Sequence, residues 1–295
     1  MTKVIARIRG GLGNQLFCYA AARRLALVNN AELVIDDVTG FARDCQYQRQ
    51  YMLDRFEISA RKATPVERME PFERYRRGFA KLASKHHSFY KRKYIEQEGI
   101  GFDTRLLQFR PKGTVYIDGL WQGEGYFKDI EGVIRQDLRI RPPLDVVNQK
   151  MASKIVACDS VCLHVRWFDS PDSVTGDNLG YEYYKNAISH IMARVRSPHF
   201  FLFSDNPDEA IRMLSLPEEI VSCIKHNQGD ENAYADLWLM KKCKHIVTAN
   251  STFSWWGAWL GESESKIILS PGLVLSGTTT AWGFKGLLPN RWTLI

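Results

Sequence analysis

Short apolar segments alternate with amphipathic segments along this chain, and the alternation restricts the fold more than any other feature. Apolar runs typical of buried strands occupy residues 4–8, 32–36, 115–119, 161–166, 200–204, 245–249 and 266–269. Apolar residues at helical spacing occupy residues 17–28, 126–138, 181–195, 207–214, 235–243 and 252–260. Strands that alternate with helices pair in parallel, so the sequence predicts an α/β fold.

The best candidate for a linker is Arg141-Pro142-Pro143, because two prolines exclude a helix. We therefore expect two Rossmann-like domains that face a cleft, over residues 1–143 and 144–295. Residues 40–110 are charged and irregular, and predict helices and loops that lie over the first sheet.

The composition excludes several classes of protein. No run of about 18 apolar residues is present, so no membrane-spanning helix is expected. The N-terminus enters a strand pattern instead of a signal peptide. The six cysteines form no C-x-x-C pair and no zinc spacing. We interpret them as reduced thiols of a cytoplasmic protein.

The net charge of +7 is concentrated in one segment. Residues 61–93 contain 11 Lys or Arg and 3 Glu, a net charge of +8. The simplest interpretation is a solvated helical surface. Contact with the anionic inner face of a membrane, or with another anionic partner, is the alternative. A nucleic acid is not expected, because no helix-turn-helix, zinc finger or RNP motif accompanies the charge.

Arg166 follows a strongly apolar strand, and a guanidinium is costly to bury unless it meets an anion. The carboxyl ends of strands in α/β sheets are common ligand sites, and the planar guanidinium matches phosphate oxygens. Arg166 therefore predicts a phosphate site, with His164 and Asp169 beside it. A core histidine is the alternative for His164, and a helix cap or a salt bridge to Arg166 is the alternative for Asp169.

A glycine-rich turn follows the first strand and contains Gly11, Gly13 and Asn14. Glycines let a ligand approach the backbone, and the first N–H groups of a helix attract anions. The turn lacks the third glycine of a dinucleotide fingerprint, where Leu16 stands, and it lacks the Gly-Lys-Ser/Thr of a P-loop. A tight turn without a ligand is the alternative.

Two more strand ends carry polar residues. Ser204, Asp205 and Asn206 are expected to cap a helix that begins at Pro207, although Asp205 could also line the cleft. The second strand end, residues 250–254, combines hydroxyls with a helix start, which suits a phosphate. The candidate ligand-binding residues of this segment are Asn250, Ser251, Thr252 and Ser254.

The remaining candidates lie on two helices. Asp236 is a carboxylate beside apolar residues and could cap its helix or accept the paired N–H donors of a guanine. The tryptophans that follow the hydroxyl-rich segment are expected to pack in the core, and they are Trp255, Trp256 and Trp259.

Four blocks of sequence resemble the α-1,2-fucosyltransferases of glycosyltransferase family eleven, in the family order. They are Gly10-Gly11-Leu12-Gly13-Asn14-Gln15-Leu16-Phe17, Gly119-Leu120-Trp121-Gln122 with Tyr126-Phe127-Lys128-Asp129-Ile130, His164-Val165-Arg166…Asp169, and Ala249-Asn250-Ser251-Thr252-Phe253-Ser254-Trp255-Trp256-Gly257-Ala258-Trp259-Leu260. The resemblance implies a GT-B-like fold and GDP-β-L-fucose as donor.

The resemblance also implies residue roles. Arg166 would hold the pyrophosphate, and Ser251 with Thr252 would bind the β-phosphate. His164 would lie against the nucleotide, Asp236 would read guanine, and Asn14 with the glycine turn would face the sugar from the other domain. The chain departs from the family where Trp167 and Phe168 replace an arginine and a glycine, and where Ser170 replaces a tyrosine.

The resemblance further implies transfer of L-fucose, with inversion, to the 2-hydroxyl of a galactose-containing glycan. Asp169 is the candidate base, and Asp177 and Glu182 compete with it. No Asp-x-Asp occurs in the chain, so no metal and no cofactor is expected.

Three alternatives remain open. One is transfer from another GDP-sugar. A second is a nicotinamide-dependent oxidoreductase, because Asp36 ends the strand after the glycine turn. A third is a glycan-binding module, which 8 Trp and 12 Tyr would suit.

Overall fold

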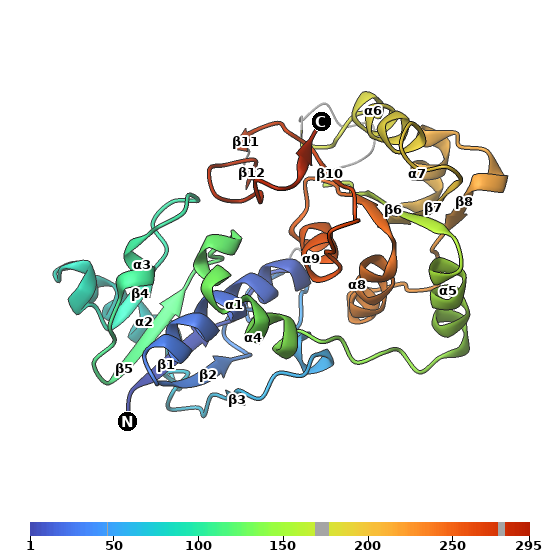
Figure 1. Ribbon diagram of the computed structural model, residues 1–295. Coiled ribbons are helices and arrows are strands. Elements are labelled where there is room, and N and C mark those ends of the chain that lie inside the picture. Colours follow the sequence, from blue (N-terminus) through green and yellow to red (C-terminus); the bar gives the residue numbers. More distant parts are fainter. Residues whose placement is uncertain (46, 169–176, 277–280) are drawn as a thin grey trace. The chain divides into compact units, whose positions relative to one another are not determined.

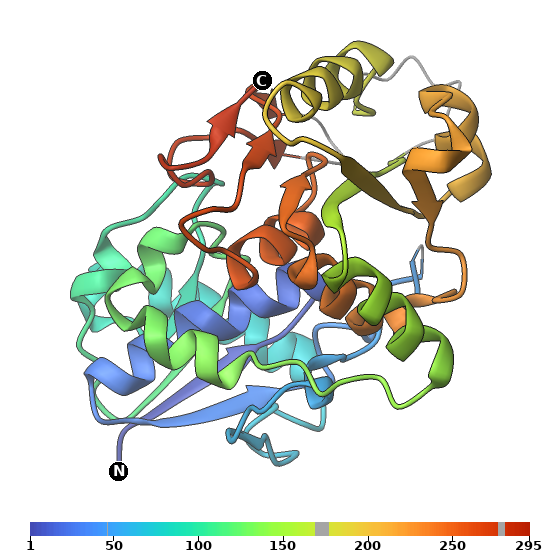
Figure 2. The ribbon, with the colours of Figure 1, turned by 45° about the vertical axis from the view of Figure 1, so that its right-hand side comes forward.

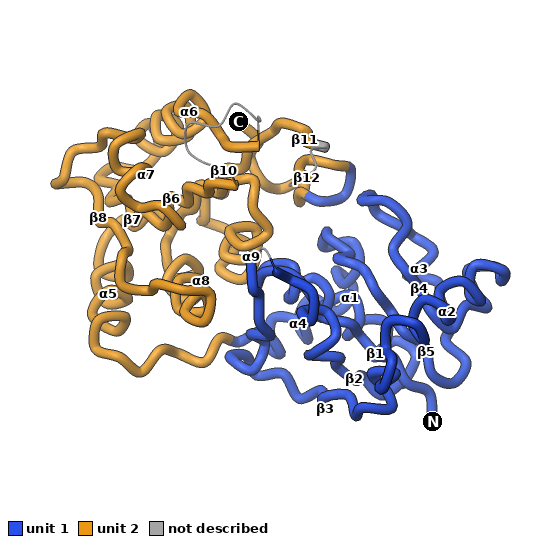
Figure 3. Tube along the Cα trace, turned by 180° about the vertical axis from the view of Figure 1, so that it is seen from behind, with its two compact units in different colours: residues 1–139, 285–287 blue, residues 140–284, 288–295 orange. Residues whose placement is uncertain are grey.

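The computed structural model describes residues 1–45, 47–168, 177–276 and 281–295, which form two compact α/β units. Unit 1 comprises residues 1–139 and 285–287, and unit 2 comprises residues 140–284 and 288–295 (Figure 3). The predicted α/β class is confirmed, since each unit contains one parallel sheet. The main chain passes from unit 1 to unit 2 between Arg139 and Ile140, whereas the sequence placed this passage after Pro143.

Unit 1 contains a five-stranded parallel sheet in the order β3-β2-β1-β5-β4 (Figure 1). Its strands are β1 (Lys3–Arg7), β2 (Glu32–Asp36), β3 (Arg61–Lys62), β4 (Tyr94–Glu96) and β5 (Thr114–Asp118). Its helices are α1 (Leu12–Val28), α2 (Glu73–Lys85), α3 (Arg105–Gln108) and α4 (Glu131–Asp137). After β1 the chain forms β2 and β3 on one side of β1, and then β4 and β5 on the other side. The topological switch point of this sheet therefore lies between β1 and β5.

Helix α1 lies directly after the glycine turn and packs on β1 and β2. Gly11 is its N-cap, so the helix begins at Leu12 and already includes Gly13 and Asn14. Alanine and leucine favour this helix, and buried residues surround it on most sides, which ties it to the sheet.

Unit 2 contains a six-stranded parallel sheet in the order β13-β10-β9-β6-β7-β8. Its strands are β6 (Asp159–Val165), β7 (Pro198–Ser204), β8 (Val221–Cys223), β9 (His245–Val247), β10 (Ile268–Ser270) and β13 (Thr293–Leu294), and β11 (Leu275–Ser276) pairs separately with β12 (Ala281–Trp282). Its helices are α5 (Val146–Val156), α6 (Tyr181–Met192), α7 (Pro207–Leu214), α8 (Ala233–Lys242) and α9 (Thr252–Leu260). The chain moves from β6 to β7 and β8 and then crosses to β9, so the switch point of this sheet lies between β6 and β9.

Two helical layers enclose the sheet of unit 2. Side chains of α6, including Tyr184 and Ile191, share one core with Val161 and Leu163 of β6. Helix α8 packs against α5 and α9, which can be followed in Figure 1 and from a second direction in Figure 2. Trp255, Trp256 and Trp259 are fully buried in α9, which confirms the prediction that they are core residues.

The structure also corrects several predicted elements. Residues 40–110 contribute strands β3 and β4 to the first sheet, in addition to helices and loops. Helix α5 was not predicted. Within residues 126–138 the α-helix spans only Glu131–Asp137, because Phe127 adopts φ −146° and separates the 3-10 turns Glu124–Tyr126 and Lys128–Ile130.

All six cysteines are free thiols. In the described part of the chain, no helix combines the length and the apolar character that crossing a membrane requires.

Candidate functional site

The predicted phosphate-binding residues of unit 2 lie at the topological switch point of its sheet. Arg166 directly follows β6, and residues 248–251 connect β9 to α9. Strands β6 and β9 are neighbours, with Leu163 opposite Val247. The two loops therefore leave adjacent strand ends at the edge where α/β sheets usually bind ligands.

Arg166 is held by a carboxylate from the next strand. Val165 of β6 pairs with Ser204 of β7, so Arg166 and Asp205 follow paired strand ends. The Arg166 Nη1 atom lies 2.6 Å from Asp205 Oδ2, and Asp205 Oδ1 accepts a hydrogen bond from the Trp167 backbone N–H at 3.1 Å. The guanidinium also lies over the ring of Phe168, 5.5 Å from its centroid. One carboxylate thus orients both the cation and the backbone after it.

Trp167, at one position where the chain departs from the family pattern, packs against the core of unit 2. Its indole therefore contributes apolar contact at this strand end. Among the described residues that directly follow β6, which are 166–168, Arg166 is the cation.

His164 is the last but one residue of β6 and is buried. Burial and the nearby Arg166 lower the pKa of its imidazole to about 3, so the ring is neutral at physiological pH. The ring lies 5.7 Å from the ring of Phe253 in α9. His164 is therefore a neutral side chain that packs between β6 and α9.

The segment before α9 uses some of its polar groups internally. Ser251 is the N-cap, and its hydroxyl accepts the N–H of Phe253. The Ser254 hydroxyl is buried, accepts the N–H of Ala249 and donates to the Ser251 carbonyl. Thr252 begins the helix and is partly exposed, as is Ser251. The N-terminus of α9 thus offers an anion a partly exposed hydroxyl pair and backbone N–H groups.

Several buried polar atoms at this edge have no hydrogen-bond partner within the described residues. They are His164 Nδ1, Trp167 Nε1, Thr248 Oγ1 and Asn250 Oδ1. The Asn250 amide nitrogen, in contrast, donates to the Asp177 carbonyl at 2.8 Å. Buried polar groups are nearly always satisfied in folded proteins, so a cluster of unpaired ones favours a ligand or ordered water at this edge.

Asp236 lies in the first turn of α8, which also begins at the carboxyl edge of the sheet. Burial raises the pKa of its carboxyl to about 7, although Asn227 donates to it at 2.8 Å and opposes the change. Asn227 is held in turn by Asn148, which also contacts His226. Asp236 is thus a positioned carboxyl group that changes charge near neutral pH.

The three candidate bases have different positions. Asp169 lies outside the described residues. Asp177 is buried, and its backbone carbonyl is bonded to Asn250. Glu182 is exposed in the first turn of α6 and lies 3.5 Å from Lys185. The role of base therefore stays a prediction for Asp169.

In unit 1, the glycine turn is connected to the second sequence block of the family. Asn14 Oδ1 accepts a hydrogen bond from Gln122 Nε2 at 2.9 Å. Gln15 is buried, donates to the carbonyls of Gly10 and Gln50, and accepts the N–H of Met52. Gly11 and Gly13 are placed as N-cap and first-turn residues by these contacts. The loops after β1 and β5 are therefore joined at the switch point of this sheet.

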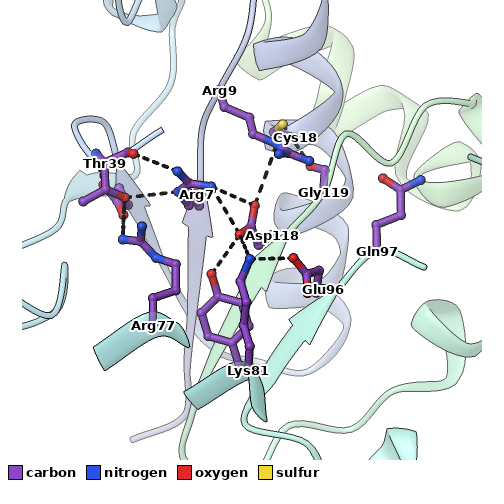
Figure 4. Close-up of polar contacts among 12 residues, drawn as sticks. Arg7, Arg9, Cys18, Thr39, Arg77, Lys81, Glu96, Gln97, Asp118 and Gly119 are labelled. Atoms are coloured by element: carbon purple, nitrogen blue, oxygen red, sulfur yellow. Dashed lines mark hydrogen bonds and ion pairs between the residues drawn. The ribbon is translucent and has the colours of Figure 1, made fainter. Parts of the chain in front are cut away.

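A charged cluster at the same edge of unit 1 was not predicted (Figure 4). Asp118 ends β5 and is almost fully buried. Its carboxylate lies 3.3 Å from Arg7, 3.7 Å from Arg9 and 3.2 Å from Lys81, and accepts the Tyr94 hydroxyl at 2.9 Å. The pKa of Asp118 is lowered: burial would raise it, but the three cations and the Tyr94 hydroxyl outweigh burial.

The signal for this cluster was present in the sequence. Arg7 and Asp118 are charged residues that end apolar strands, and Arg166 directly follows one. The strand register that brings them together, with Ala6 opposite Ile117, could not be read from the pattern.

Asp36 is fully engaged within unit 1. It accepts the Thr39 hydroxyl and the N–H groups of Val38 and Thr39, and Arg77 lies 3.7 Å away. A nicotinamide-binding half would need this carboxylate for the ribose hydroxyl. The internal bonds of Asp36 therefore argue against the oxidoreductase alternative.

No group of three or more His, Cys, Asp or Glu side chains among the described residues is arranged to hold a metal ion.

Comparison of the sequence with known protein families identifies the family of this chain. The sequence model described as "Glycosyl transferase family 11" matches residues 3–276.

Two curated relatives come from Escherichia coli. One is an alpha-1,2-colitosyltransferase, 27% identical over 281 residues that cover 92% of each chain. The other is the O-antigen biosynthesis glycosyltransferase WbnK, 27% identical over 292 residues that cover 90% of this chain and 92% of WbnK.

Among solved structures, the chain resembles NodZ, a fucosyltransferase from Bradyrhizobium. A NodZ structure soaked with GDP-fucose superposes with a TM-score of 0.53 at 16% identity, over 88% of this chain and 92% of NodZ. This likeness concerns the fold alone, which is GT-B-like as expected. Because the family model spans nearly the whole sequence, the chain belongs to glycosyl transferase family 11.

Proposed function

We propose that this glycosyltransferase moves L-fucose from GDP-β-L-fucose to the 2-hydroxyl of a galactoside, with inversion at the anomeric carbon. The proposal rests on one observation above all. Arg166 and the N-terminus of α9 lie on neighbouring strands at the switch point of unit 2. A guanidinium and free helix N–H groups there suit the diphosphate of a nucleotide sugar.

In this scheme the acceptor hydroxyl attacks the anomeric carbon while the bond to the β-phosphate oxygen breaks. Negative charge then grows on the departing GDP. Arg166 and the N-terminal N–H groups of α9 stabilise that charge, together with the hydroxyls of Ser251 and Thr252. Asp205 contributes by holding the guanidinium in one orientation before the donor arrives.

The nucleotide base is assigned to the region of Asp236. A guanine presents two adjacent N–H donors, which a carboxylate accepts together. Asn227 positions this carboxylate at 2.8 Å. His164, neutral and buried, would pack beside the nucleotide. Asn250 Oδ1 has no hydrogen-bond partner among the described residues and could accept a hydrogen bond from the ligand.

The proton of the acceptor hydroxyl is assigned to Asp169 as base. Asn14 and the turn at Gly11 and Gly13 are assigned to the sugar. We propose that no metal takes part, because the positive charge that a metal would supply to the leaving group is available from Arg166 and α9. Activity that survives EDTA tests this point.

The acceptor is proposed to be a cell-surface glycan precursor made in the cytoplasm. The supporting observation is that one relative at 27% identity is named as an O-antigen biosynthesis glycosyltransferase.

A second donor is favoured by the other relative, whose name specifies α-1,2 transfer of colitose. Colitose is fucose without its 3-hydroxyl, so a donor site with fewer polar groups would suit it. Trp167, where the resemblance to the family implies an arginine, is apolar and packs against the core of unit 2, which is a departure of that kind.

A donor panel separates these possibilities. The protein is incubated with GDP-fucose, GDP-colitose, GDP-mannose or UDP-galactose and a β-galactoside, and the product linkage is assigned by NMR. Transfer of fucose to the galactose 2-hydroxyl is the expected result. Transfer only from GDP-colitose would replace the donor, and a linkage to another hydroxyl would refute the regiochemistry.

A further inference from the structure

Helix α2 has its polar and apolar faces reversed relative to an ordinary surface helix. The side chains that face unit 1 are polar: Arg77 donates to Thr39 at 2.7 Å, Lys81 lies 3.2 Å from Asp118, and the Ser84 hydroxyl accepts the Tyr94 N–H. These residues are separated by four and three positions, so they form one stripe of the helix. Hydrogen bonds and ion pairs therefore connect this stripe of α2 to its unit.

The opposite stripe of α2 is apolar and exposed. It consists of Tyr75, Phe79 and Leu82, whose exposed fractions are 74%, 74% and 59%, and Phe72, which is 70% exposed, directly precedes the helix. We refer to these four residues as the α2 apolar face. Scattered exposed apolar residues are common, but three aligned on one helix, with a fourth directly before it, indicate an interaction surface.

Phe72 adds an observation of a different kind. It precedes the helix with φ +67°, in the left-handed region that a bulky side chain rarely adopts. Glycine would adopt this conformation without strain. The chain therefore places an aromatic ring at an exposed position where another residue would fold more easily.

The α2 apolar face lies within the most basic segment of the chain. Arg74, Arg76 and Lys85 of the same helix are exposed, and so are Lys91 and Lys93 beyond it. A second copy of this face would bring these cations against one another, which disfavours self-association. An anionic surface would instead be attracted by the same cations that surround the aromatic rings.

We propose that α2 is a docking helix that lies in the surface of an anionic membrane, with the α2 apolar face inserted among the lipids. An amphipathic helix with aromatic and leucine residues on one face and cations around it binds in this manner. The cations contact lipid phosphates while the rings enter the interfacial layer. This inference does not depend on which sugar the enzyme transfers.

The experiment is sedimentation of the full chain with vesicles of phosphatidylcholine alone, or of phosphatidylcholine mixed with phosphatidylglycerol. Binding is expected only with the anionic vesicles and should weaken as salt rises, because surface charges are screened. If the wild-type protein stays in the supernatant with both kinds of vesicle, the proposal is overturned.

Two variants separate the apolar and the charged contributions. Tyr75→Ser/Phe79→Ser/Leu82→Ser should weaken binding by about tenfold or more, as the loss of three inserted side chains implies. Arg74→Glu/Arg76→Glu should weaken binding by at least about fivefold per charge at low salt. Equal binding by wild type and both variants would contradict the assignment to α2.

Matched controls are available in unit 2. Leu144 and Val147 are 95% and 54% exposed, and Leu144→Ser/Val147→Ser removes apolar surface elsewhere. Arg194→Glu/Arg196→Glu reverses two exposed charges with the same spacing as Arg74 and Arg76. Both controls should bind vesicles as the wild type does, and a comparable loss in them would refute a site on α2.

Phe72→Gly distinguishes a docking role from a folding role. Because glycine suits the left-handed conformation, this variant should unfold at the same or a higher temperature while it binds anionic vesicles more weakly. Unchanged vesicle binding would remove Phe72 from the proposed surface.

Two further measurements exclude other occupants. Light scattering without lipid should give the same mass for wild type and the triple Ser variant, whereas a dimer that the variant abolishes would identify a second copy as the occupant. The KM for a soluble acceptor without vesicles should also be unchanged. A raised KM would identify the face as a glycan-binding surface instead.

Discussion

The Arg166 guanidinium of unit 2 is paired at 2.6 Å with the Asp205 carboxylate, which also accepts the backbone N–H of Trp167. The pair follows from the register of β6 and β7, in which Val165 lies opposite Ser204. The cation that we propose as the diphosphate-binding group is thus held in place by an anion before the ligand arrives. The ligand must compete with this anion or share the guanidinium with it.

Removal of the guanidinium is expected to abolish most of the activity. Arg166→Ala should lower kcat by about 100- to 1,000-fold, as the loss of one group that stabilises a leaving anion does. Arg166→Lys should recover only part of this, because an ammonium lacks the planar pair of donors. Initial rates with saturating GDP-fucose measure both, and near-normal turnover of Arg166→Ala would exclude the proposed site.

Neutralising Asp205 should increase the affinity for the nucleotide. Asp205→Asn keeps the shape and the acceptor for Trp167 but removes a negative charge next to Arg166. GDP should then bind about three- to tenfold more tightly, since one repulsive charge is lost in a partly buried site. Calorimetric titration with GDP provides the measurement. Weaker binding would mean that Asp205 matters more for orienting Arg166 than for competing with phosphate.

Asp236 predicts a pH dependence of nucleotide binding. Burial raises the pKa of this carboxyl to about 7, and only the ionised form can accept the two guanine N–H donors. GDP affinity should therefore increase from about pH 6 to about pH 8, with release of up to one proton on binding near pH 7. Titrations in buffers of different ionisation enthalpy measure the proton. Asp236→Asn should remove the dependence, and an unchanged pH profile in that variant would place guanine elsewhere.

The same carboxyl group predicts a trend in stability. Its pKa is higher in the folded protein than in the unfolded chain, so between about pH 4 and about pH 7 the folded state binds more protons. This group alone makes the free energy of unfolding decrease as pH rises through that window. Comparison of Asp236→Asn with wild type by urea unfolding across the window isolates the contribution, and parallel curves would contradict the raised pKa.

The charged cluster of unit 1 should be important for stability. Asp118→Asn leaves Arg7, Arg9 and Lys81 without their shared carboxylate. We expect a loss of about 2–4 kcal/mol in the free energy of unfolding, since all three cations are partly exposed. The pKa of Asp118 is lowered by folding, so its contribution is present above the unfolded pKa of about 4 and is lost as pH falls below it. Urea unfolding of unit 1 at neutral and acid pH should show the difference between wild type and variant shrinking in acid.

Gly40 offers a test of the packing next to this cluster. A Cβ at this position would lie 1.8 Å from the Ile8 carbonyl oxygen, and Gly40→Ala should destabilise by about 1–3 kcal/mol or more because backbone must move. Gly78 in α2 is the matched control: no atom lies within 4 Å of an added Cβ, and Gly78→Ala should stabilise by about 0.5–1 kcal/mol. Thermal unfolding of both variants checks the signs, and a tolerated alanine at position 40 would contradict the close approach.

Much of the fold could be predicted from local patterns. Strand β2 and helices α7 and α9 have the predicted boundaries, and apolar periodicity is the reason. The short edge strands β3 and β4 were missed, because two or three residues carry no detectable period and their sheet partners provide the stability. Most of the candidate ligand residues were proposed because they follow strands, a rule that depends only on sequence order.

Partners across strands and the orientation of helices were decided by the tertiary structure. The sequence placed Arg166 at a strand end, but the register of β6 and β7 made Asp205 its partner. The sequence likewise makes α2 amphipathic and basic, but it does not determine which stripe of the helix meets the sheet. Carboxylates at the ends of β4 and β5 bind Lys81, so the polar stripe faces inward and the aromatic rings face outward. Helical periodicity determines which residues share a face, whereas the side chains on the neighbouring strands determine which face is buried.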